Sequence, residues 1–164
     1  MFLNILVAVD GSPSSIHALR EAVDLARVQN STLTILTVAP PAPPLLPVTG
    51  VDPAALRDDV ERWAAQVLAD AATTVPDDVL LRTVQRYGHP GSEVVRELET
   101  GRYDLVVLGS RGRGPARSGL LGSVNGSVHY HSSVPMLSVP GADEDGEPRE
   151  ALMAIAGAGG PAAA

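Results

Sequence analysis

The regular alternation of short apolar runs with longer stretches of helical periodicity constrains the fold of this chain most. Leu3–Val9 is apolar except for Asn4, and Leu105–Leu108 is apolar throughout. Both runs are too short for helices and suit strands that are buried on both faces. Because strands of this kind occur mainly in parallel sheets with helices on each side, the pattern predicts a doubly wound α/β fold.

Five strands and four helices are expected along the chain. The first helix is expected to begin at Pro13 with Ser12 as its N-cap, and a short third helix is expected to begin at Pro90 and stop at Gly101. A five-stranded parallel sheet with right-handed crossovers and helices on both faces follows. The expected strands are residues 3–9, 32–38, 79–86, 105–108 and 136–139, and the second and fourth helices are centred on residues 56–71 and 123–131.

The chain is expected to form one domain over residues 1–140. Residues 141–164 change in character, first acidic and then rich in Ala and Gly, and are interpreted as a tail outside the core. Six of the fourteen prolines lie between positions 40 and 53, which predicts a long stiff loop before the second helix. The sequence indicates no function for the loop or for the tail.

Charge and composition exclude several classes of function. The net charge of −7 disfavours general nucleic-acid binding, and the absence of Cys excludes disulfides and thiolate chemistry. All twelve basic residues are Arg, so neither a Schiff base nor the lysine of a P-loop is available. With no signal-peptide pattern at the start and no apolar run of membrane-spanning length, a cytoplasmic protein without a membrane segment is expected.

Two features are expected to meet at one edge of the sheet. Asp10 follows the first strand, and a glycine-rich run from Gly109 to Gly114 follows the fourth. In a doubly wound sheet these strand ends open onto the crevice where ligands bind. Glycine permits backbone N–H groups to approach phosphate oxygens, and Gly122–Ser123 at the start of the next helix adds further donors.

The charge distribution agrees with an anion site in this segment. No Asp or Glu occurs from Leu105 to Ala142, a window in which about four are expected from the chain-wide frequency. Arg111, Arg113 and Arg117 lie inside it. From composition alone, however, the glycines could serve only tight turns, and Asp10 could simply hold the turn before the first helix.

The spacing of these glycines carries a resemblance to a known family. Gly109-x-x-Gly112, nine further residues and then Gly122–Ser123 resemble the signature of ATP-binding universal stress proteins. The likeness extends over about residues 2–140, and the segments that share it are 5–12, 104–112 and 134–139.

This resemblance implies the strand order 3-2-1-4-5, a homodimer formed through the last strand, and ATP in the crevice. A Mg²⁺ ion bridging Asp10 and the phosphates is chemically reasonable, although no carboxylate cluster in the sequence supports it. Asp10 would contact the ribose or adenine side, Val38 would face adenine, and Ala8 is a further candidate nucleotide contact. Arg111 and Arg113 are added as candidate ligand contacts because of their charge. The residues expected to line the phosphates are Gly109, Gly112, Gly122, Ser123 and Val124.

The function expected is that of a regulatory ATP-binding protein, with a partner protein still unidentified. No general base or nucleophile is evident near the phosphates, so no catalytic residue is assigned and at most slow ATP hydrolysis is expected. His129 and His131 lie two positions apart on a helix and point to different faces, which disfavours a metal site. Two alternatives remain open: an ATP-using adenylating enzyme or ATPase on a related fold, and a nucleotide-free dimerisation module.

Overall fold

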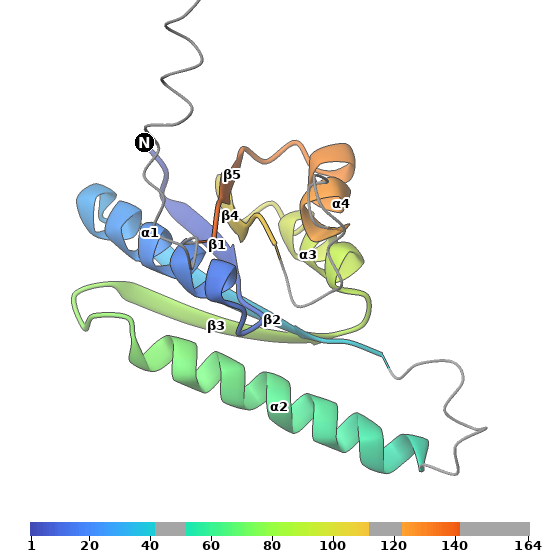
Figure 1. Ribbon diagram of the computed structural model, residues 1–164. Helices are drawn as coiled ribbons and strands as arrows, with labels where there is room; N and C mark the ends of the chain where they lie inside the picture. Colours follow the sequence, from blue (N-terminus) through green and yellow to red (C-terminus); the bar gives the residue numbers. More distant parts are fainter. Residues whose placement is uncertain (42–51, 112–122, 142–164) are drawn as a thin grey trace, which may run out of the picture.

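The computed structural model describes residues 1–41, 52–111 and 123–141. Its five strands are all parallel and form one sheet in the order β3-β2-β1-β4-β5, as predicted (Figure 1). The strands are β1 (Asn4–Ala8), β2 (Thr32–Ala39), β3 (Leu80–Tyr87), β4 (Leu105–Gly109) and β5 (Met136–Val139).

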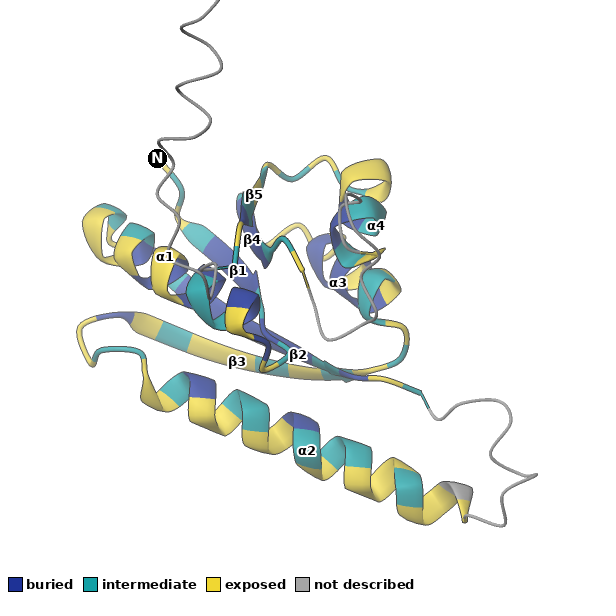
Figure 2. Ribbon diagram, in the orientation of Figure 1, coloured by how far each residue is buried: buried dark blue, intermediate teal, exposed yellow. Residues whose placement is uncertain are grey.

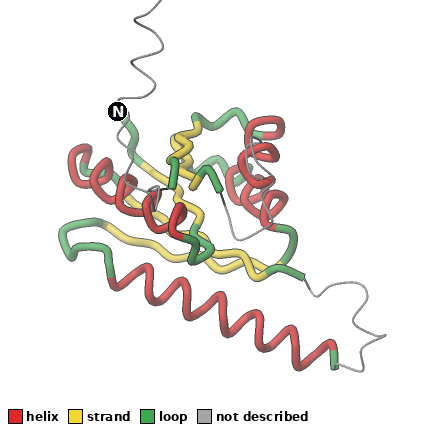
Figure 3. Tube along the Cα trace, viewed as in Figure 1, coloured by secondary structure: helices red, strands yellow, loops and turns green. Residues whose placement is uncertain are grey.

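Helices cover both faces of this sheet, which confirms the doubly wound α/β class. Two of them pack on one face and two on the other (Figures 1 and 3). The first pair is α1 (Pro13–Gln29) and α2 (Pro53–Thr73), and the second pair is α3 (Pro90–Leu98) and α4 (Ser123–His131).

The central strands are buried on both sides, because their alternating side chains feed two separate cores. Ile5 and Val7 of β1 pack under α1 and α2, whereas Leu6 packs under α3 and α4. Each fully buried side chain of this size contributes about 1.5–3 kcal/mol. At the edge of the sheet, β3 is mostly half-buried or exposed (Figure 2).

The helix ends follow local sequence rules. Ser12 caps α1 by accepting a hydrogen bond from the Ser15 N–H, and Pro13 occupies the first turn, as predicted. The third helix begins at Pro90, and Gly101 lies just beyond its end with a φ of 70°. These caps place the first turn of α1 directly after β1.

A cluster of ionised side chains ties β3 to α3. The Arg86 guanidinium donates to the Glu97 carboxylate, with Nε 2.8 Å from Oε2, and the Tyr103 hydroxyl donates to Oε1 at 2.7 Å. The Glu97 side chain is only 4% exposed. Burial opposes its ionisation, but the hydrogen bonds from Tyr103 and Arg86 outweigh burial and lower the pKa of Glu97.

Candidate ligand-binding site

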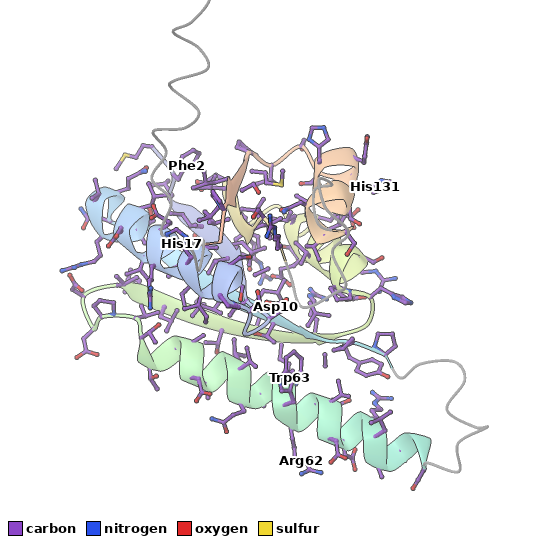
Figure 4. All side chains as sticks on the ribbon, in the orientation of Figure 1. Phe2, Asp10, His17, Arg62, Trp63 and His131 are labelled. Carbon is purple, nitrogen blue, oxygen red and sulfur yellow. The ribbon has the colours of Figure 1, made fainter. Side chains whose placement is uncertain are left out.

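The edge of the sheet at which the topology predicts a ligand site is formed by the carboxyl ends of β1 and β4. These strands are adjacent, with Ala8 paired to Leu108, yet β1 leads to β2 on one side of the sheet and β4 leads to β5 on the other. Asp10 follows β1 (Figure 4) and Gly109 ends β4, so the structure brings these two predicted residues to the same edge. In doubly wound sheets this switch point is where ligands bind.

Asp10 holds the turn that leads into α1. Its Oδ1 accepts from the Ser12 N–H at 3.0 Å and from the Ser12 hydroxyl at 2.6 Å, while its own N–H donates to Ser15 Oγ at 3.3 Å. The turn-holding role that the sequence left open is therefore present. It fixes the carboxylate beside the first turn of α1.

Gly109 is required by the close approach of α1. A Cβ atom added here would lie 2.4 Å from Ser14 Oγ and 2.8 Å from the Ser14 carbonyl carbon, closer than any real Cβ contact. The N–H groups that follow are already bonded, Ser110 to the Val139 carbonyl at 2.7 Å and Arg111 to Ser14 Oγ at 3.3 Å. These two N–H groups are therefore already engaged, and the donors that a phosphate would need at the described edge would have to come from elsewhere.

The first turn of α4 supplies such donors. The first N–H groups of any α-helix have no acceptor within the helix, and they carry the positive end of its dipole. Ser123 at the start of α4 is exposed and adds a hydroxyl, and Arg111 is exposed at the end of the described loop. Gly112, Arg113 and Gly122 lie outside the described residues.

An apolar wall adjoins these polar groups. Ala8, Val38 and Val124 come from β1, β2 and α4, and all three are partly buried against the core beneath α3 and α4. Three residues expected to contact a ligand thus lie on one face of the sheet.

Two residues at this edge were not singled out from the sequence. Asn125 donates from Nδ2 to the Gly109 carbonyl at 3.0 Å and is 1% exposed, and Ser14 bonds to both backbone groups of Arg111. An Asn within a helix, where its propensity is low, is a usable signal. Nothing in the sequence distinguishes Ser14 from Ser12 or Ser15.

A separate open groove lies on the opposite face, between the first turn of α1 and α2. Its volume is about 660 Å³, and its walls include Gly11, Ile16, Trp63 and Val67. Trp63 points from α2 toward the sheet, whereas Arg62 points away from it (Figure 4). The sequence analysis did not predict this groove.

Neither metal ligands nor membrane-spanning helices are found in the part of the chain that the structure describes. No three His, Cys, Asp or Glu residues within it are grouped as a metal site would need. None of its helices combines the length and hydrophobicity that a bilayer crossing requires.

The topology defines a doubly wound α/β protein in which Asp10 and Gly109 lie at the topological switch point. The chain belongs to the universal stress protein family, whose model matches residues 1–140. The protein YxiE of Bacillus subtilis, a universal stress protein, is 32% identical over 149 residues, covering 85% of this chain and 99% of its own length.

Solved structures agree with this assignment. Universal stress protein UspA from Lactobacillus plantarum superposes with a TM-score of 0.67 at 28% identity, over 84% of this chain and 97% of its own. A universal stress protein crystallised in complex with cAMP gives a TM-score of 0.63 at 25% identity, over 86% of this chain and 99% of its own.

Proposed function

We propose that this protein binds an adenine nucleotide, ATP in particular, in the crevice between β1 and β4. The observation that carries the proposal is the convergence of Asp10, Gly109 and the first turn of α4 at one edge of the sheet. The similar structure that contains cAMP supports an adenine nucleotide as the class of ligand.

In this proposal Val38 faces the adenine with Ala8 beside it, and Asp10 lies on the ribose or adenine side. The phosphates meet the first turn of α4, the Ser123 hydroxyl and the Arg111 guanidinium. The predicted phosphate contacts are completed by Gly109, Gly112, Arg113, Gly122 and Val124. Mg²⁺ would arrive with ATP and be held by the phosphates and Asp10, where it would neutralise phosphate charge.

We further propose a regulatory role with little or no catalysis. The Asp10 Oδ1 atom already accepts hydrogen bonds from the Ser12 N–H and hydroxyl, which supports a turn-holding role for this carboxylate and not the role of a general base. A regulatory role acts through a partner protein that recognises the nucleotide-bound form. We place it in the cytoplasm, as the sequence predicts.

The direct test is mass analysis of the small molecules released when the purified protein is denatured, followed by calorimetric titration with ATP, AMP and cAMP. We expect ATP to be released and to bind more tightly than AMP. Failure of all three nucleotides to bind would sink the proposal. Release of AMP and pyrophosphate in the presence of an acceptor would instead favour the adenylating enzyme.

Arg111→Gln tests the contribution of charge to nucleotide binding. We expect ATP affinity to fall about fivefold to tenfold and AMP affinity to fall less, because a guanidinium–phosphate bond is stronger when more phosphate charge is present. The ATP effect should shrink at high salt. Arg20→Gln, on the exposed side of α1, is the matched control. Equal losses for ATP and AMP would contradict a phosphate contact.

Dimerisation through β5 is also proposed. This strand is an edge of the sheet, and Leu137 on it is 38% exposed, while Tyr130 on the neighbouring helix is 81% exposed. An unpaired edge with exposed apolar side chains favours pairing with a second copy. Leu137→Asp is expected to convert a dimer to a monomer in light-scattering chromatography, whereas Leu3→Asp, far from this edge strand in sequence and also exposed, should leave the dimer intact.

A further inference from the structure

Two side chains on opposite faces of the sheet form hydrogen bonds to the same short stretch of backbone, Gly109–Arg111. Ser14 in the first turn of α1 accepts from the Arg111 N–H at 3.3 Å and donates to the Arg111 carbonyl. Asn125 in the first turn of α4 donates to the Gly109 carbonyl at 3.0 Å. The end of β4 is therefore held from both sides before the chain enters the β4–α4 connection.

Both residues are buried, at 5% exposure for Ser14 and 1% for Asn125. Buried hydrogen bonds of this kind are not replaced by water when one partner is removed. Helix formation does not account for Asn125, since Asn is a weak helix former and Gly126 follows it. The bond to Gly109 is the interaction that its buried side chain makes among the described residues.

Of the two polar atoms in the Asn125 side-chain amide, only Nδ2 has a hydrogen-bond partner among the described residues. Its Oδ1 is buried and has no hydrogen-bond partner among the described residues. An unsatisfied buried oxygen is unfavourable, so its retention at the first turn of α4 needs a compensating role. The hydrogen bond from Asn125 Nδ2 to the Gly109 carbonyl supplies that role.

We propose that Ser14 and Asn125 are positioning residues for nucleotide binding, an inference that rests on the proposed function. Together they fix Arg111 relative to the first turn of α4, the two groups assigned to the phosphates. A site held in its bound geometry before the ligand arrives loses less conformational freedom on binding and so binds more tightly. Ser14 and Asn125 act through the backbone of residues 109–111, without touching the ligand.

Asn125→Ala and Ser14→Ala test this proposal. We expect ATP affinity to fall about tenfold in the first variant and about fivefold in the second, the size of effect expected from one lost buried hydrogen bond. Asn125→Leu, which fills a similar volume without the donor, should behave like Asn125→Ala. The measurement is calorimetric titration with ATP, together with urea unfolding of each variant.

Val128→Ala is the matched control. Val128 lies on α4 at 1% exposure within the core beneath α3 and α4, and its side chain has no polar atom with which to bond residues 109–111. We expect this variant to lose at least as much stability as Asn125→Ala while keeping ATP affinity within about twofold of the wild type. If Val128→Ala loses as much affinity as Asn125→Ala, a positioning role is overturned and only a structural one remains.

Hydrogen exchange of the Arg111 N–H, measured by NMR without nucleotide, separates this inference from the proposed function. We expect faster exchange in Ser14→Ala and Asn125→Ala than in Val128→Ala at matched stability. If the wild type binds no nucleotide, the proposed function fails, while the exchange data still report on the hydrogen bonds that Ser14 and Asn125 make to residues 109–111. If both variants bind ATP like the wild type, the positioning role is wrong.

Discussion

Replacing Gly109 with Ala is expected to destabilise the protein by about 3 kcal/mol, with the urea midpoint as the measurement. The added Cβ would meet Ser14 Oγ at 2.4 Å and the Ser14 carbonyl carbon at 2.8 Å. The hydroxyl could rotate away, but the Ser14 backbone atoms can move only together with the helix turn that contains them. The first turn of α1 must therefore shift away from β4.

Gly126→Ala is the matched control for this substitution. Gly126 lies within α4, and a Cβ added there meets nothing within 4 Å. We expect this variant to be more stable than the wild type by up to about 1 kcal/mol, because Ala favours the helix. A second check is Ser14→Gly in the Gly109→Ala background, which should restore only part of the loss because the backbone clash remains. Equal stability of the two Gly→Ala variants would contradict the close approach of α1.

Arg86→Met is expected to destabilise the protein by about 3 kcal/mol, because it leaves the Glu97 carboxylate buried without its cation. We place the effect at the lower end for a buried pair since Arg86 itself is 31% exposed and Tyr103 still donates to Glu97. Arg27→Met is the control: its pair with Asp78 is about half exposed on both sides, so a loss below about 1 kcal/mol is expected. Adding Glu97→Gln to Arg86→Met should recover part of the stability.

The same cluster predicts how stability depends on pH. The pKa of Glu97 is lowered in the fold, so its contribution is complete above the ordinary value of 4.5 and is lost as the pH falls through the lower folded value. Burial and the neighbouring Glu97 raise the pKa of Tyr103 to about 12, so its contribution is complete below 10 and is lost as the pH rises toward 12. The measurement is the free energy of unfolding as a function of pH. Compared with the wild type, Glu97→Gln should lack the loss at low pH, and Tyr103→Phe should lack the loss at high pH. Parallel curves at every pH would show that the cluster does not respond to protonation.

The fold was predictable because its signals are local. A short apolar run such as Leu105–Leu108 indicates a buried strand, and Ser12 followed by Pro13 indicates the start of a helix. No strand boundary differs from the prediction by more than one residue, and Ser123–His131 forms the expected helix in spite of Gly126. Asp10 and Gly109 could be placed at one edge because a doubly wound topology leaves a single switch point for them.

The sequence by itself thus determined the class of fold, the edge of the sheet at which Asp10 and Gly109 come together and, through the spacing of its glycines, the resemblance to universal stress proteins. Only the tertiary structure decided that Gly109 is required by α1, that Ser14 and Asn125 hold the end of β4, and that Glu97 is buried beside Arg86 and Tyr103. The physical reason is separation along the chain. Ser14 and Arg111 are 97 positions apart, and a contact of that kind arises from how whole elements pack, which no local pattern of residues records.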